Sequence, residues 1–167
     1  MNSLLCIGIL SLAILQDSAP QKQSPVLAPQ LLLTQADAAH ILGEKSSLAD
    51  STTVSANGVK TYRCSFQAAS ENRDGRVGNI YFLYEEYEKL SLAQKKYNVT
   101  RTANEDNGII VLEDLGEEAY FHTDNVNFYF IMVRKGNKVI IMKVNKITST
   151  TSLDEFHRVA RKITDAL

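Results

Sequence analysis

Two apolar runs near the C-terminus constrain the fold more than any other feature. Residues 128–133 and 139–144 are almost wholly apolar, and Lys135-Gly136-Asn137 lies between them. A strand with one face in water alternates apolar and polar residues, so strands that are apolar on both faces need cover on both faces. A short polar connection containing glycine is typical of a hairpin turn. The sequence therefore predicts a central β-hairpin buried on both sides.

The N-terminal half predicts a second hairpin. Residues 60–67 alternate, with Tyr62, Cys64 and Phe66 on one face. Asn57-Gly58, just before this strand, is a strong tight-turn signal. Further strands are predicted at residues 52–54, 77–84, 109–112, 119–122 and 126–134.

Three segments have helical spacing of apolar residues, at residues 34–42, at residues 85–97 and from Ser152 to the C-terminus. Thr34 with Asp37, and Ser152 with Glu155, have the spacing of capping boxes. The order of helices and strands predicts an α+β fold, with an antiparallel β-sheet of about six to seven strands and three helices packed mainly on one face.

The N-terminus predicts export. Residues 4–15 are apolar over about twelve residues, too few to span a bilayer but enough for the hydrophobic part of a secretory signal. We expect a signal peptide at residues 1–19, a Pro/Gln-rich spacer at 20–30 and one domain at 31–167. The segment lacks the usual basic start and Pro20 obscures the cleavage site, so a buried helix, a retained anchor or an upstream start remain alternatives. Cys6 precedes the apolar run and does not fit a lipid anchor.

The predicted location is periplasmic or extracellular, with association with the envelope left open and no transmembrane span in the mature chain. The chain has 18 basic and 19 acidic residues. This balance gives no basic excess for nucleic acid or an anionic membrane, so neither partner is predicted. Only Cys64 remains after cleavage, so no internal disulfide is expected.

Few residues suggest catalysis. Cys64 shares the apolar face of its strand, which favours a buried structural thiol over a nucleophile. His40 and His157 favour surface or packing roles. His122 and Asp124 lie close together near a strand end and are the weak candidates for general acid–base chemistry, although a solvated pair is favoured.

Acidic residues gather in one part of the chain, but their spacing matches neither an EF-hand nor a clear carboxylate pair, and it favours a solvated rim. They are Glu105, Asp106, Glu113, Asp114, Glu117 and Glu118. No metal site and no cofactor are predicted. The candidate ligand-binding residues are Tyr81, Tyr84, Tyr87 and Tyr97, which either line a groove between the sheet and the middle helix or form ordinary core edges.

Residues 32–43, 62–66 and 115–121 together resemble segments of small exported bacterial proteins of unknown function, often lipoproteins or extracytoplasmic sensor-type domains, with an α+β fold likened to the PsbP family. The resemblance covers about residues 31–167 and implies a fold, with no catalytic residue. The chain lacks the lipidation cysteine of many such proteins, so membrane attachment stays open.

The function predicted first is a non-enzymatic, exported cell-envelope module that binds an unknown small molecule or envelope protein between the sheet and the 85–97 helix. The alternatives are a small hydrolase or metal-dependent enzyme using His122 and Asp124, and a purely structural envelope protein. The oligomeric state is left open.

Overall fold

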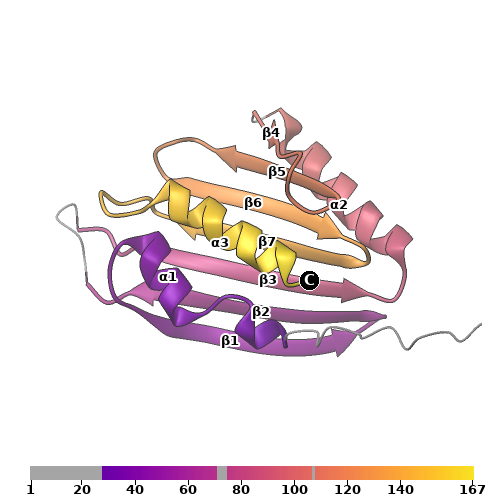
Figure 1. Ribbon diagram of the computed structural model, residues 1–167, viewed down its shortest axis with the longest axis horizontal. Helices are drawn as coiled ribbons and strands as arrows, with labels where there is room; N and C mark the ends of the chain where they lie inside the picture. Colours follow the sequence, from indigo (N-terminus) through magenta and orange to yellow (C-terminus); the bar gives the residue numbers. More distant parts are fainter. Residues whose placement is uncertain (1–27, 71–74, 107) are drawn as a thin grey trace, which may run out of the picture.

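The computed structural model describes residues 28–70, 75–106 and 108–167. Within these ranges the chain forms a seven-stranded antiparallel sheet, three α-helices and one short 3-10 helix (Figure 1). In chain order the elements are η1 (Pro29–Leu31), α1 (Gln35–Leu42), β1 (Ser46–Ala56), β2 (Val59–Ala68), β3 (Asn79–Tyr87), α2 (Leu90–Glu105), β4 (Ile110–Val111), β5 (Glu118–Thr123), β6 (Phe128–Lys135), β7 (Lys138–Asn145) and α3 (Leu153–Asp165).

The predicted signal peptide and most of the predicted spacer lie outside the described residues. Pro29 and Gln30, at the end of that spacer, already belong to η1, and Leu32 and Leu33 after it are buried in the core. The first buried core residue among those described is Leu32.

The structure confirms the α+β fold with an antiparallel sheet and helices packed on it. The strand order is β1-β2-β3-β7-β6-β5-β4. This order joins two antiparallel meanders, β1-β2-β3 and β4-β5-β6-β7, through pairing of β3 with β7. The connection from β3 to β4 runs through α2, which contacts β3, β6 and β7.

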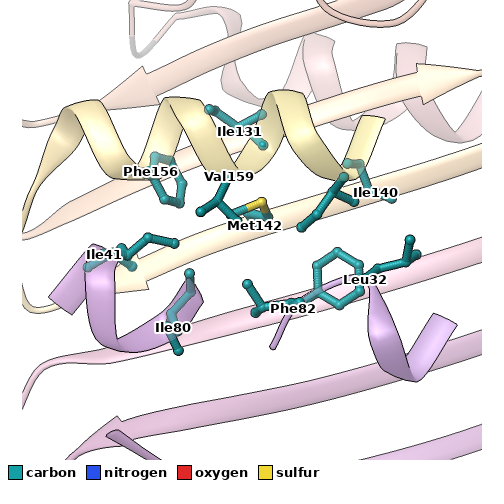
Figure 2. Packing of buried hydrophobic residues seen from close by; sticks show 14 of the residues in the cluster. Leu32, Ile41, Ile80, Phe82, Ile131, Ile140, Met142, Phe156 and Val159 are labelled. Carbon is teal, nitrogen blue, oxygen red and sulfur yellow. The ribbon is translucent and has the colours of Figure 1, made fainter. Parts of the chain in front are cut away.

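The two faces of the sheet carry separate hydrophobic cores. One core lies under α1 and α3, where Val159 of α3 lies beside Met142 of β7, and where Phe156 of α3 and Phe82 of β3 belong to the same cluster (Figure 2). The other lies under α2, and its buried members are Tyr87, Ala93, Tyr97, Tyr120, Met132 and Val139. Two of the three described helices thus share one face, and α2 covers part of the other.

The predicted central hairpin is confirmed as β6–β7. Ile131 and Ile140 enter the core under α1 and α3, while Met132 and Val139 enter the core under α2. All four side chains are 0% exposed. Successive strand residues point to opposite faces, which explains why both alternating sets of side chains had to be apolar.

The middle helix was predicted too early. Residues 85–87 continue β3, where Glu85 lies opposite Thr61 of β2 and Val139 of β7. The helix begins only at Leu90 and continues to Glu105. Helical spacing across this boundary was misleading because pairing with a strand on each side holds residues 85–87 extended.

The predicted cap of α1 is confirmed in full. The Asp37 backbone N–H donates to Thr34 Oγ1 at 3.2 Å, and the Thr34 backbone N–H donates to Asp37 Oδ2 at 3.0 Å. The cap of α3 is only half of the predicted box. Ser152 Oγ accepts from the Glu155 N–H at 3.2 Å, but the Ser152 N–H donates to the carbonyl of Ile41 at 2.8 Å.

The end of α1 is therefore locked to the segment before α3. Besides the Ser152 bond, Thr150 Oγ1 donates to the Leu42 carbonyl at 2.8 Å. Gly43 ends α1 with φ +71°, and a Cβ placed on it would lie 2.1 Å from the Thr150 carbonyl oxygen. Position 43 therefore requires glycine, because its backbone is left-handed and because no space is left for a side chain.

We expect Gly43→Ala to lower the free energy of unfolding by several kcal/mol, well above the roughly 1–2 kcal/mol of left-handed backbone strain alone. Gly136→Ala is the matched control, because Gly136 has φ +59° and a Cβ placed on it would meet nothing within 4 Å. Urea unfolding of both variants measures the difference, and equal losses would contradict the steric argument.

Asp37 ties α1 to α3 through charge. Lys162 Nζ donates to Asp37 Oδ2 at 2.6 Å, and Thr34 Oγ1 donates to the same oxygen at 2.6 Å. Burial alone would raise the pKa of Asp37, but the bonds from Lys162 and Thr34 outweigh it and lower the pKa below 3.8. The ionised carboxylate is thus favoured in the folded state.

A lowered folded pKa stabilises the fold above the unfolded pKa, and this contribution disappears as pH falls through the folded value. We therefore expect the wild-type chain to lose more unfolding free energy than Asp37→Asn between about pH 6 and pH 2. Urea unfolding across this range tests it. Other carboxylates titrate in both proteins, so only the difference between the two reports on Asp37. If the unfolding free energies of wild type and Asp37→Asn fell in parallel with pH, Asp37 would make no such contribution.

Candidate functional site

Two adjoining hollows lie at the β1–β2 turn, one of them between this turn and α2, and we call the two together the α2 groove. The apolar hollow has a volume of about 330 Å³ and is lined by Asn57, Val59, Tyr87, Leu92, Lys95, Lys96 and Val99. The second, of about 420 Å³, shares Asn57, Val59 and Tyr87 and adds Ser55, Ala56, Gly58, Lys60, Glu86, Glu88 and Asn137. Both hollows are open to solvent; the hairpin turn lines both, and α2 lines only the apolar one.

The hairpin wall is fixed by backbone contacts. Asn57 and Gly58 have φ of 52° and 74°, as a tight two-residue turn requires. The Glu88 N–H donates to the Gly58 carbonyl at 3.0 Å. The Tyr87 N–H donates to the Asn137 carbonyl at 2.9 Å, and the Asn137 side-chain amide donates back to the Tyr87 carbonyl. These bonds hold the turn, the end of β3 and the β6–β7 turn together.

An ionic contact fixes α2 against the sheet beside the groove. The Tyr87 hydroxyl donates to Glu85 Oε2 at 2.8 Å, and Lys96 Nζ lies 3.8 Å from the same oxygen. Burial, together with the bond to Glu85, raises the pKa of Tyr87, so its hydroxyl stays protonated and keeps donating. The ammonium group of Lys96 therefore already has a carboxylate partner, Glu85.

The groove leaves apolar surface and two cations, Lys95 and Lys60, open. Leu92 is 40% exposed and Val99 is 62% exposed, although both lie beside the apolar hollow. Lys95 lies next to them and makes no ion pair among the described residues. Glu86, Glu88 and Lys60 line the other hollow, and Lys60 makes no ion pair among the described residues. The groove thus has one apolar hollow with Lys95 beside it and a second hollow lined by two carboxylates and one ammonium group.

The structure does not bring the four candidate tyrosines to one groove. Of the four, Tyr87 lines the α2 groove. Tyr97 is buried under α2, with its ring centroid 5.8 Å from that of Tyr120. Tyr84 belongs to the core on the opposite face. Tyr81 is half-buried and lies opposite Lys143 in the β3–β7 register, further from the hairpin turn.

His122 and Asp124 do not contact one another among the described residues. Asp124 Oδ1 accepts from three backbone N–H groups, including that of Asn127 at 2.7 Å, and Oδ2 accepts from the Asn127 side chain. These bonds lower the pKa of Asp124, the Asn127 backbone bond having the largest effect. The His122 ring lies 5.0 Å from that of Phe128, and its buried Nδ1 has no hydrogen-bond partner. The carboxylate organises a turn and leaves the imidazole unoriented.

The other reactive side chains take structural positions. Cys64 is 1% exposed, and burial raises the pKa of its thiol. The ring of His157 lies 5.0 Å from that of Phe121, and burial lowers its pKa. The His40 side chain is 64% exposed, with Nδ1 4.0 Å from Glu155.

Two of the clustered acidic residues, Glu117 and Glu118, pair with one buried cation. Arg134, 4% exposed, donates to both Glu117 and Glu118. Arg101 lies 3.7 Å from Glu105. Among the described residues no group of three or more His, Cys, Asp or Glu side chains could hold a metal ion.

Of the groove's lining residues the sequence predictions named only Tyr87 as a ligand-binding candidate, and the helix residues they missed include Leu92, Lys95 and Val99. Their exposure on a helix looks ordinary, because helices alternate covered and solvated sides. One feature of the sequence could have revealed them. Leu92 and Val99 are two helical turns apart, so they form a second apolar stripe beside that of Ala93 and Tyr97. Only the position of the β1–β2 hairpin shows that this second apolar stripe faces a hollow.

Comparison with known proteins gave no match to a family model, to a curated protein or to a solved structure. The likeness to PsbP-type exported proteins therefore stays a prediction. Among the described helices, none has the length and apolar character needed to cross a bilayer.

The burial of Cys64 gives a direct test of its structural role. In a Cys6→Ser chain, we expect the native Cys64 thiol to react with a disulfide reagent at pH 8 at least about 100 times more slowly than in urea, because reaction requires an exposed thiolate. Absorbance of the released thiolate measures both rates. Equal rates in buffer and urea would show an accessible, reactive cysteine.

Proposed function

We propose that this protein is an exported cell-envelope binding module, related in fold to the PsbP-type proteins, and that its ligand occupies the α2 groove. The observation that carries the proposal is an open apolar hollow walled by Leu92, Val99 and Val59, where two exposed apolar side chains of α2 lie beside the same hollow. Exposed apolar side chains gathered around a hollow are typical of binding sites. The predicted export supports an envelope role.

The charges beside the hollow select the ligand class. Lys96 is neutralised by Glu85, whereas Lys95 makes no ion pair among the described residues. In the second hollow, Glu86 and Glu88 outnumber Lys60, so an anion is less favoured there than beside Lys95. We infer an amphipathic ligand, with an extended apolar group over Val59 and Val99 and an anionic end beside Lys95.

The arrangement around His122 favours binding over hydrolysis. Asp124 is held by its own turn, so it does not orient the imidazole. A general base needs a group that fixes its tautomer and direction, and His122 has none in the described part of the chain. The proposal is accordingly non-enzymatic.

Matched amphiphiles test the proposal. We expect the full chain to bind dodecanoate below its micelle concentration, with micromolar affinity, and to bind dodecyltrimethylammonium more weakly, as measured by isothermal titration calorimetry. Val99→Asp should weaken dodecanoate binding at least about tenfold, since it puts a carboxylate into the apolar hollow. Lys95→Glu should reverse the preference between the two head groups.

Val126→Asp is the control, because Val126 is 61% exposed and lies in the turn before β6. The apolar run at residues 4–15 is present in every variant, so differences between variants report on the groove. Binding that is equally strong in wild type, Val99→Asp and Val126→Asp would overturn the proposed site.

A further inference from the structure

Strand β1 is an open edge of the sheet. It pairs with β2 on one side, and no other described element pairs with its outer side (Figure 1). Ten of its residues lie between Ser47 and Ala56, and all are exposed except the half-buried Thr52. An edge strand presents unpaired backbone N–H and C=O groups to any chain that can lie beside it.

The usual protection of an edge is sparse in β1. Proteins discourage edge pairing with lysine, proline, very short strands or bulges. Residues 46–56 contain no Lys, Arg or Pro and a single charge, Asp50. One bulge interrupts the ladder between Leu48 and Asp50, so the stretch 50–56 is regular. The opposite edge, β4, is blunted by being only two residues long.

The hairpin turn shows which backbone groups face outward. In a two-residue hairpin the flanking residues, here Ala56 and Val59, exchange both backbone hydrogen bonds, and bonded pairs then alternate along the ladder. Val54 and Thr52 therefore direct their N–H and C=O groups toward β2. Ser51, Thr53 and Ser55 direct theirs away from the sheet, and Thr53 is the middle residue of the regular stretch.

We propose that β1 pairs antiparallel with β1 of a second copy of this chain, about a two-fold axis at Thr53. This register places Thr53 opposite Thr53 of the second copy and Ser51 opposite Ser55 of the second copy. Each such pair exchanges two backbone hydrogen bonds. The two sheets become one continuous sheet with both α2 helices on the same side.

The side chains favour this self-pairing. Thr–Thr and Ser–Ser pairs across strands are favourable, while like charges directly opposite are not. Asp50 falls opposite Ala56 of the second copy, so the single charge of the strand meets no like charge. Val54, 50% exposed, falls opposite Thr52 of the second copy and becomes partly covered.

The blunted β4 edge explains why the pairing closes. Joining β1 of one copy to β4 of another would repeat without end, but β4 offers only Ile110 and Val111. Pairing of β1 with itself uses the same surface twice and stops at a dimer. The interface is one strand wide, which places it with small, weak interfaces, so we expect dissociation in the micromolar range.

The test uses the full chain in sedimentation equilibrium from about 5 to 500 μM. We expect a concentration-dependent dimer. Thr53→Pro removes an outward N–H while leaving the β2 ladder intact, and Thr53→Lys places two ammonium groups on the axis. Both should stay monomeric at about 500 μM, with wild-type circular dichroism and an unfolding free energy within about 1 kcal/mol of wild type. Val126→Lys has the same charge change as Thr53→Lys at a distant exposed turn and should still dimerise.

Crosslinking tests the register. In a Cys6→Ser chain, Thr53→Cys places two thiols across the axis at about 5.5 Å between Cα atoms, within disulfide range. Mild oxidation should give a covalent dimer, whereas Ser55→Cys should not, because its equivalents lie about 13 Å apart along the strands. A monomer at all concentrations, dimers unaffected by both Thr53 variants, or equal crosslinking at 53 and 55 would each overturn the proposal.

Discussion

The pairing of β3 with β7 is the interaction on which the rest of the structure depends. It joins the two meanders over a register that runs from Asn79 opposite Asn145 to Glu86 opposite Lys138. Both strands are central, so their side chains supply both cores. The helices α1 and α3 can cover one face only because Ile80, Phe82 and Met142 are brought side by side there. The α2 groove has the same origin, because α2 crosses β3, β7 and β6 and leaves the opposite hairpin β1–β2 uncovered on that face.

Local patterns predicted those parts of the fold that local contacts determine. The β6–β7 hairpin, the cap of α1 at Thr34 and the apolar stripe of α3 each depend on residues a few positions apart. The β3–β7 pairing joins Leu83 to Ile141 and leaves no short-range pattern. The same distant pairing explains the error at residues 85–87. Tyr87, Leu90, Ala93 and Tyr97 have helical spacing, but strands on both sides of β3 offer more backbone hydrogen bonds than one extra helical turn.

That error carried through to the predicted site. If residues 84–87 form a strand, Tyr84 and Tyr87 must point to opposite faces, because side chains alternate along a strand. The predicted cluster of tyrosines therefore divided between two cores and left Tyr87 at the groove. The cationic and apolar residues of α2 were not recognisable for a different reason. Whether exposed Leu92 and Val99 face water or a hollow depends on where the β1–β2 hairpin lies, and its place follows from the non-local strand order.

The proposed groove and the proposed dimer edge meet in one hairpin. Val59 and Asn57 line the groove, while Ser51, Thr53 and Ser55 form the outward edge, and Ser55 and Ala56 also line the second hollow. Because β1 is exposed along nearly its whole length, its position depends mainly on the ladder with β2. A ligand against Val59 of β2 and a second copy against Thr53 of β1 would each restrict the same hairpin. Binding free energies that act on a shared element are coupled reciprocally, so ligand binding would favour the dimer by the factor by which the dimer favours the ligand.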